Sequence, residues 1–217
     1  VINVFKKGCV VHTLFLFNSM LEVCFQSNKL EAGCDEAGRG CLAGPVFAAA
    51  VILPPNCNIE GLDDSKKLTE RKRYELRPII EKIAVAYAVS FCTPEEIDKF
   101  NILRASIIAM HRCLDKLNVE PEYIIVDGNR FYAYKSIPHQ TIVKGDGKYM
   151  NIAAASILAK TYRDDFMLKL HNEFPQYYWH ENKGYPTQKH IEAIEKYGYS
   201  KYHRKSFHLK SDQLSLF

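Results

Sequence analysis

The most constraining feature of the sequence is a continuous apolar run, Val46–Leu53 (VFAAAVIL), which ends at Pro54 and Pro55. A short apolar run closed by prolines is typical of a strand that is buried on both faces. A sheet that contains such a strand needs a layer of structure on each side. The run therefore predicts a layered fold with a sheet at its centre.

Strand and helix patterns alternate along the rest of the chain. Strands are predicted over residues 30–35, 84–92, 123–126 and 141–143, and helices over residues 69–83, 94–117, 151–174 and 187–197. This alternation predicts an α/β fold, with a mixed central β-sheet flanked by helices. Helical patterns gather after residue 150, which predicts a small helical C-terminal subdomain beside the sheet.

The composition is that of an ordinary globular protein. Of the 217 residues, 47% are hydrophobic and 25% are charged, which argues against disordered and coiled-coil classes. The formal net charge of +4 permits a nucleic-acid partner without requiring one. The seven cysteines include no C-x-x-C pair, so we expect reduced thiols in a cytoplasmic protein, with neither a disulfide framework nor a zinc site.

Acidic residues follow three of the predicted strands. Asp35 and Glu36 follow the first strand, Asp127 follows YIIV, and Asp146 follows TIV. Active sites of open α/β sheets collect beyond the carboxyl ends of strands, so these carboxylates can meet. Their mutual repulsion would be relieved by Mg²⁺ or Mn²⁺, and two such ions can catalyse phosphodiester hydrolysis. Taken singly, each acid is more often a turn former or a helix cap.

Two polar segments lie in the sequence near these acids. Gly38-Arg39-Gly40 follows the first acidic pair directly, and glycines there let backbone N–H groups approach a ligand closely. Ser65 and Lys66 stand in a polar loop before a predicted helix, where they could hold a backbone phosphate. An ordinary turn and a solvated charged loop are the alternative interpretations.

Several longer motifs resemble the ribonuclease HII family of type 2 ribonucleases H. They are CDEAGRG at 34–40, LAGPV at 42–46, DSKKL at 64–68, VDG at 126–128, KGD at 144–146, AASILAK at 154–160 with Arg163 and Asp164, KGYPT at 183–187 and HRKSF at 203–207. They occur in the order found in the family. The resemblance spans residues 30–207.

The resemblance implies a ribonuclease H-like fold and an endoribonuclease that uses two Mg²⁺ or Mn²⁺ ions. The family hydrolyses the RNA strand of RNA–DNA hybrids. It also incises duplex DNA on the 5′ side of single ribonucleotides, leaving a 3′-hydroxyl and a 5′-phosphate. By resemblance, Asp35, Glu36, Asp127 and Asp146 are the catalytic, metal-binding carboxylates.

The resemblance also implies how the ribonucleotide is recognised. Gly38-Arg39-Gly40 would read its 2′-hydroxyl, and Tyr185 would pack against the sugar beside the RNA–DNA junction. The 2′-hydroxyl is what distinguishes RNA from DNA at a single position. Asp164 belongs to the match, but we expect it to form structural ion pairs on its helix and leave it out of the site.

Two C-terminal segments suggest partners. Residues 181–210 carry a net charge of +4 with interleaved tyrosines, a pattern that can follow a nucleic-acid backbone but is also common on solvated faces. The last five residues, Gln213, Leu214, Ser215, Leu216 and Phe217 (QLSLF), resemble the pentapeptide by which bacterial replication and repair proteins bind the DNA sliding clamp. A frayed terminus is the alternative for this tail.

We divide the chain by these features into four parts and expect a monomer. They are an N-terminal extension over 1–29, a catalytic domain over 30–174, a helical substrate-binding region over 175–210, and a clamp-binding tail over 211–217. Residues 1–19 are expected to be an extension that the fold does not need. Alternatives are a ribonuclease HIII that cleaves only hybrids, a two-metal exonuclease, and a non-catalytic adaptor for nucleic acid and clamp.

Overall fold

A computed structural model describes residues 21–207, and the expected 1–19 extension and the tail at 213–217 lie outside them. Within the described part, the centre is a five-stranded sheet in the order β3-β2-β1-β4-β5. The strands are β1 (Glu31–Ala37), β2 (Val46–Ile52), β3 (Ala86–Cys92), β4 (Tyr123–Asp127) and β5 (His139–Ile142). The longer helices are α1 (Glu70–Ile83), α2 (Pro94–Phe100), α3 (Ile102–Lys116), α4 (Met150–Glu173) and α6 (Gln188–Tyr197).

The sheet is mixed, as the sequence predicts. β2 pairs antiparallel with both β1 and β3, whereas β4 pairs parallel with both β1 and β5. In register, Cys34 lies opposite Val126, and Asp127 lies opposite Ile142. Because β1, β4 and β5 run in the same direction, their carboxyl ends share one edge of the sheet.

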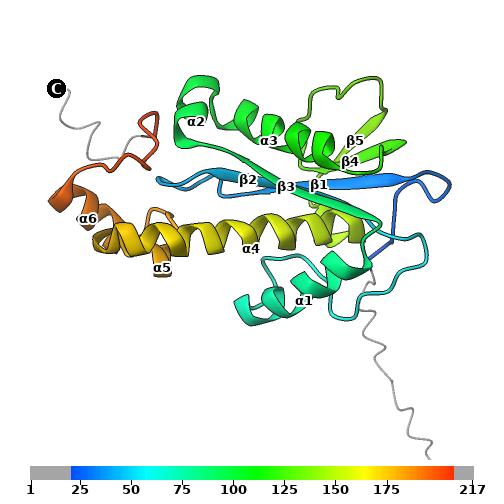
Figure 1. The fold of residues 1–217 in the computed structure, drawn as a ribbon, viewed down its shortest axis with the longest axis horizontal. Coiled ribbons are helices and arrows are strands. Elements are labelled where there is room, and N and C mark those ends of the chain that lie inside the picture. Colours follow the sequence, from blue (N-terminus) through cyan, green and yellow to red (C-terminus); the bar gives the residue numbers. More distant parts are fainter. Residues whose placement is uncertain (1–20, 208–217) are drawn as a thin grey trace, which may run out of the picture.

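Helices cover both faces of the sheet, with α2 and α3 on one face and α4 and α1 on the other (Figure 1). All seven residues of β2 are buried, which confirms the predicted two-sided burial. Its side chains alternate between the two cores: Ala48 and Ala50 pack with α3, and Ala49 and Val51 pack with α4. The apolar run is continuous because both of its faces need apolar side chains.

Helix α4 lies very close to β1. A Cβ built on Gly33 would stand 2.5 Å from the Ile152 nitrogen, so only glycine fits at this point of β1. The alanines at 153–155 of α4 are fully buried and keep the helix surface low against the sheet. This close approach brings α4 side chains beside the carboxyl end of β1.

A third core joins the C-terminal elements to the end of α4. Trp179 in α5 (Trp179–Asn182), Tyr177 in η2 (Pro175–Tyr177) and Ile194 in α6 pack with Met167 and Leu170. Tyr177 and Trp179 are therefore core residues, whereas Tyr178 between them is exposed.

Two element predictions need correction. The helix predicted over 94–117 is interrupted at Asn101, whose φ of 66° lies in the left-handed region, so α2 and α3 are separate. The strand predicted over 141–143 is β5, which begins earlier, at His139, because pairing with Ile124 extends it.

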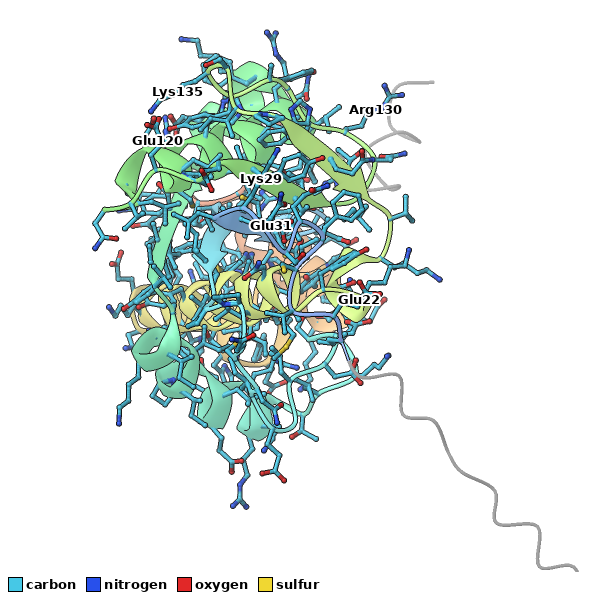
Figure 2. The ribbon with its side chains drawn as sticks, turned by 90° about the vertical axis from the view of Figure 1, so that its right-hand side faces the viewer. Glu22, Lys29, Glu31, Glu120, Arg130 and Lys135 are labelled. Carbon is cyan, nitrogen blue, oxygen red and sulfur yellow. The ribbon has the colours of Figure 1, made fainter. Side chains whose placement is uncertain are left out.

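Polar contacts close the other end of the sheet, away from the carboxyl ends of β1, β4 and β5. Glu31, the first residue of β1, is buried and accepts hydrogen bonds from the Phe25 and Gln26 N–H groups and from the Asn151 side chain (Figure 2). Near this end, Lys135 and Glu120 form an exposed ion pair at 3.2 Å. The contacts of Glu31 attach Phe25 and Gln26 to the start of β1.

Two further features are the state of the cysteines and the character of the helices. The cysteines at 24, 34, 41, 57, 92 and 113 are free thiols. None of the helices between residues 21 and 207 combines the length and the apolar character that a membrane span requires.

Candidate active site

Three carboxylates meet at the edge where the parallel strands end. Asp35 belongs to β1, Asp127 is the last residue of β4, and Asp146 lies in the short helix η1 (Gly145–Gly147) after β5. One oxygen from each of the three lies within 4.8 Å of the others. The Gly145 N–H donates to Asp127 Oδ1 at 2.7 Å and fixes the orientation of that carboxylate. The predicted meeting of these acids is therefore present in the structure.

Burial gives this cluster an unfavourable electrostatic energy. Asp35 is 4% exposed and Asp146 is 2% exposed. Burial, with the nearby Glu36 and Asp127, raises the pKa of Asp35 well above its usual value. Burial likewise raises the pKa of Asp146, and Asp127 adds to the effect. Oxygen donors gathered in this way fit hard divalent cations such as Mg²⁺ and Mn²⁺.

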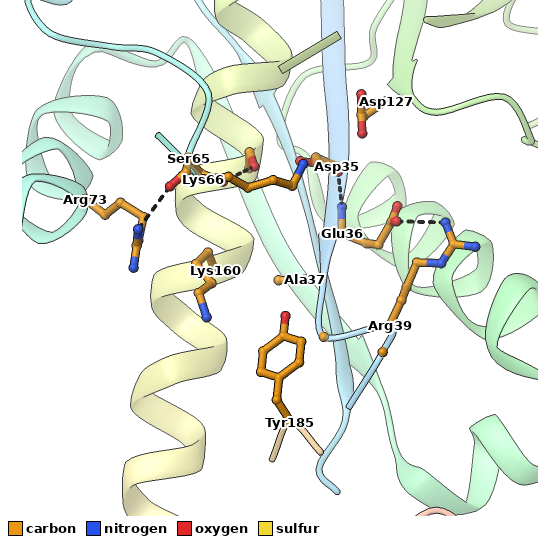
Figure 3. A pocket seen from close by; sticks show the side chains of 13 residues that line it. Asp35, Glu36, Ala37, Arg39, Ser65, Lys66, Arg73, Asp127, Lys160 and Tyr185 are labelled. Atoms are coloured by element: carbon orange, nitrogen blue, oxygen red, sulfur yellow. Dashed lines mark hydrogen bonds and ion pairs between the residues drawn. The ribbon is translucent and has the colours of Figure 1, made fainter. Parts of the chain in front are cut away.

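Glu36 lies beside this cluster without joining it. Its carboxylate accepts a hydrogen bond from Arg39 at 3.1 Å, and Figure 3 shows the two side chains turned toward each other. Burial raises the pKa of Glu36, although Arg39 opposes that effect. The structure thus brings together three of the four predicted ligands and holds the fourth next to them.

Ser65 and Lys66 both reach the site from the loop before α1. The Lys66 ammonium donates to Asp146 at 3.0 Å, although 76% of its side chain is exposed. Ser65 is buried, and its hydroxyl lies 2.8 Å from the Ser156 hydroxyl of α4. Their predicted contact with a phosphate stays a prediction.

Two fully buried arginines hold the turn that follows β1. Arg204 donates to the carbonyls of Gly38, Arg39 and Gly44 at 2.7, 2.9 and 3.0 Å. Arg163 of α4 donates to the carbonyls of Ala43 and Pro45 in the same segment and to that of Lys183. With so many carbonyls turned inward, the turn has a fixed shape.

Tyr185 stands across the pocket from this turn. It is 38% exposed, and its hydroxyl points into the pocket toward Ala37 (Figure 3). The cations of Lys160 and Arg163 lie 5.6 and 5.9 Å from the centre of its ring. Partial burial raises the pKa of Tyr185, so its hydroxyl is protonated at neutral pH.

Most of these groups line one cavity of about 280 Å³, whereas Asp146, Arg163 and Arg204 lie behind its walls. Its walls are formed by Asp35, Glu36, Ala37, Gly38, Arg39, Gly40, Ser65, Lys66, Arg73, Asp127, Ser156, Lys160 and Tyr185. Arg73 and Lys160 are additions to the predicted site. Lys160 lies four residues before Asp164 on α4 and pairs with it at 2.8 Å, so Asp164 has the expected structural role. The four-residue spacing between Lys160 and Asp164 was the sequence signal that could have identified Lys160. The sequence contained no comparable signal for Arg73.

Known proteins with a similar sequence share one family. The ribonuclease HII family model matches residues 32–210. The ribonucleases HII of Parabacteroides distasonis and Bacteroides thetaiotaomicron are 61% and 60% identical over 197 and 198 residues, covering 91% of this chain and 99% of each relative. The crystal structure of ribonuclease H2 from Pyrococcus horikoshii has a TM-score of 0.70 at 28% identity, covering 82% of this chain and 93% of that one. Ribonuclease HII of Archaeoglobus fulgidus, solved in complex with PCNA, has a TM-score of 0.70 at 27% identity, covering 87% and 100%.

The mixed sheet with acids at its parallel strand ends defines a ribonuclease H-like nuclease. The sequence match extends over nearly all of the part of the chain that the structure describes. The chain belongs to the ribonuclease HII family and is an endoribonuclease.

Proposed function

We propose that this protein hydrolyses the RNA strand of RNA–DNA hybrids and incises duplex DNA on the 5′ side of single ribonucleotides. The products are a 3′-hydroxyl and a 5′-phosphate. One observation carries the proposal: a single pocket joins Asp35 and Asp127 to Gly38–Gly40 and Tyr185. The groups suited to phosphodiester hydrolysis therefore lie beside the groups suited to reading a ribose.

The carboxylates provide the catalytic half of the pocket. Two Mg²⁺ or Mn²⁺ ions held by Asp35, Asp127 and Asp146, with Glu36 beside them, would supply an activated water and a counter-charge for the leaving 3′-oxygen. Asp127 is already oriented by the Gly145 N–H group. The mostly exposed Lys66 side chain can leave Asp146 for a phosphate of the substrate.

The opposite wall provides the recognition half. The turn at Gly38–Gly40 has its carbonyls held by Arg204, which leaves backbone N–H groups for the ribose. The Tyr185 ring offers an apolar surface to the sugar and a hydroxyl for a hydrogen bond. A deoxyribose lacks the 2′-hydroxyl and leaves those donors unpaired, which disfavours its binding.

The C-terminal helices offer a surface for the flanking duplex. An open hollow of about 350 Å³ on and beside α6 is lined by two lysines, two tyrosines, an alanine and one acid: Tyr178, Lys189, Glu192, Ala193, Lys196 and Tyr197. Cationic side chains with exposed aromatic rings suit a phosphate backbone and sugar edges. This surface supports the substrate-binding role of residues 175–210.

The substrate assignment is tested with a labelled DNA duplex that contains one ribonucleotide. Incubation with Mg²⁺ or Mn²⁺ should give incision 5′ of the ribonucleotide, and EDTA should prevent it. An all-DNA duplex should remain intact. Cleavage of a long hybrid alone would move the function toward that of ribonuclease HIII, and inactivity of folded protein on both substrates would favour the adaptor.

Asp127→Asn tests the metal-binding role within that experiment. The amide keeps an oxygen for the Gly145 N–H but loses the charge, so cleavage should fall by about 100-fold or more while binding to the hybrid persists. Glu120→Gln is the matched control. Glu120 is exposed near the opposite end of the sheet, where it forms an ion pair with Lys135. Turnover of Asp127→Asn near that of the wild type would reject the metal role.

We further infer that Gln213–Phe217 bind the DNA sliding clamp, with the glutamine setting orientation and the Leu-Phe end filling an apolar pocket. The Archaeoglobus fulgidus relative was solved with PCNA, which supports a clamp partner in this family. A tether of this kind raises the local enzyme concentration on newly replicated DNA. Removal of ribonucleotides from that DNA is a step of DNA repair.

Deletion of residues 213–217 should abolish clamp association in a pull-down with purified clamp. Cleavage of short duplexes should be unchanged, because these residues lie beyond the family match at 32–210. Equal clamp binding by the truncated protein would refute the assignment.

A further inference from the structure

A buried cluster of rings lies beneath Tyr185 and takes no part in the chemistry described so far. His190 of α6 and Trp179 are 0% exposed, and His203 is 2% exposed. Their polar atoms join in one network: Trp179 Nε1 lies 3.1 Å from His190 Nε2, which lies 3.2 Å from His203 Nε2. Buried polar groups of this kind are costly unless each finds a partner.

The partners of His190 determine where its proton lies. The Trp179 indole N–H can only donate, so His190 Nε2 must accept. The proton of a neutral His190 ring is therefore on Nδ1, and this N–H donates to the Tyr185 carbonyl at 2.9 Å. The same carbonyl accepts from the Thr187 N–H at 2.8 Å, so both of its lone pairs are used.

His203 has the opposite tautomer for a similar reason. The Ser200 backbone N–H donates to His203 Nδ1 at 2.9 Å, so the proton of a neutral ring is on Nε2 and points at His190. His203 directly precedes Arg204, whose guanidinium holds the Gly38 and Arg39 carbonyls. The contact between the two histidines thus connects the Tyr185 segment to the support of the glycine turn.

We propose that His190 is a positioning residue, which holds the Tyr185 backbone at the distance from the glycine turn that ribonucleotide recognition needs. The proposal rests on the proposed reading of the ribose by Tyr185. His203 acts through His190, because its Nε2–H shares the one lone pair of His190 Nε2 with the Trp179 indole N–H, and two donors at this atom hold the proton of His190 on Nδ1. A tilt of the ring would break one of the two hydrogen bonds that hold the Tyr185 carbonyl.

The surroundings keep both rings neutral. Burial lowers the pKa of His190, and burial together with His190 lowers the pKa of His203 to about 4. Among residues 21–207, the groups found against the pair are the rings of Tyr177, Trp179 and Tyr199 and the Ser200 hydroxyl, and none of these is a carboxylate. A proton on His190 Nε2 would also face two donors, so protonation would break the network.

Two substitutions at one position separate positioning from stability. An Asn amide occupies the place of imidazole Nδ1, so His190→Asn keeps the bond to Tyr185 and leaves the Trp179 and His203 donors unpaired. A Gln amide reaches the place of Nε2, so His190→Gln keeps an acceptor for those two donors and loses the bond to Tyr185. The Gln variant should therefore have the higher melting temperature and the lower activity.

The readout is kcat/KM on the duplex with one ribonucleotide, at a temperature where both variants are folded. His190→Gln should fall at least about 10-fold below His190→Asn, because a small displacement of a substrate-contacting group is costly. If both variants lose activity in proportion to their loss of stability, or if Asn is the less active, the positioning role is overturned.

Tyr185→Ala separates the positioning role of His190 from the proposed reading of the ribose by Tyr185. A large loss in Tyr185→Ala with a normal His190→Gln would refute the inference and leave the proposed function standing. Wild-type activity of Tyr185→Ala would refute ribose reading by this residue and, with it, a functional role for His190.

Ring nitrogen NMR on the wild-type protein covers the case in which His190→Gln does not fold. We expect His190 as the neutral Nδ1–H tautomer and His203 as the neutral Nε2–H tautomer at pH 6. A neutral Nε2–H tautomer of His190 at that pH would overturn the proposal, since Nδ1 would then carry no proton to donate to the Tyr185 carbonyl.

Discussion

At the scale of single residues, the shape of the turn after β1 depends on what lies behind it. Gly38 has a φ of 93°, and a Cβ there would lie 2.0 Å from Arg163 Nε. Gly40 differs, since a Cβ there would meet no described atom within 4 Å. The two glycines therefore serve different purposes: Gly38 makes room for the buried arginine, and Gly40 keeps the pocket side of the turn open.

This difference gives a paired prediction for alanine substitutions. Gly38→Ala should lower the free energy of unfolding by about 1–3 kcal/mol, because the methyl group displaces Arg163 and strains the backbone. Gly40→Ala should change it by less than about 0.5 kcal/mol. Urea denaturation of both variants measures these effects.

Activity should separate the two glycines in another way. Gly40→Ala should still lower cleavage of the single-ribonucleotide duplex about 10-fold, equivalent to about 1.4 kcal/mol, because its methyl group obstructs close approach of the ribose. A fully active Gly40→Ala variant would contradict the proposed role of the turn in reading the 2′-hydroxyl.

At the scale of elements, the break between α2 and α3 shows how tertiary contacts override a helical pattern. Asn101 caps α3 by accepting from the Arg104 N–H at 3.1 Å. The break turns α2 toward the C-terminal segment, where Asp98 accepts from the Lys205 and Ser206 N–H groups. A continuous helix would have kept the apolar face but would not turn α2 in this way.

Substitution of Asn101 tests this account. Asn101→Ala should lower the free energy of unfolding by about 1–2 kcal/mol, because it loses the cap and because alanine tolerates a positive φ less well than asparagine. Asn101→Gly should cost only a few tenths of a kcal/mol, since glycine adopts that φ readily. Equal losses in thermal or urea unfolding would mean that the positive φ is unimportant.

At the scale of the whole molecule, the acidic cluster makes stability depend on pH and metal. The pKa of Asp35 is raised in the folded state, chiefly by burial. A raised pKa favours the folded state at low pH, and that contribution is lost as pH rises through the folded pKa. The metal-free protein therefore carries an electrostatic cost at neutral and alkaline pH that a divalent cation would offset.

We expect Mn²⁺ or Mg²⁺ to raise the melting temperature, and to do so more at pH 8 than at pH 5.5, where protons compete for the same oxygens. Metal at 100 times its Kd would add about 2.7 kcal/mol to the free energy of unfolding. Differential scanning calorimetry with and without EDTA measures the shift.

Asp35→Asn is the companion variant. It should raise the melting temperature of the metal-free protein at pH 8, because it removes a buried charge, and it should reduce the metal-induced shift. A metal-free Asp35→Asn protein less stable than the wild type at that pH would contradict the electrostatic account.

The layers of the fold and the neighbourhood of the site could be predicted from the amino-acid sequence. Val46–Leu53 predicted a strand buried on both faces, because apolar periodicity is a local property. Acids placed after Cys34 and Val126 predicted a shared edge, because parallel strands end together. The resemblance of the sequence motifs indicated the family, and the match to known ribonucleases HII confirmed it.

The contacts between individual side chains could not be predicted and are seen only in the three-dimensional structure. It turned Glu36 toward Arg39, put the Lys66 ammonium on Asp146, and placed His190 under the Tyr185 carbonyl. It also brought Arg204 to a turn 166 residues earlier in the chain. Such contacts depend on side-chain rotamers and on packing between distant segments, and neither leaves a periodic signal in the sequence.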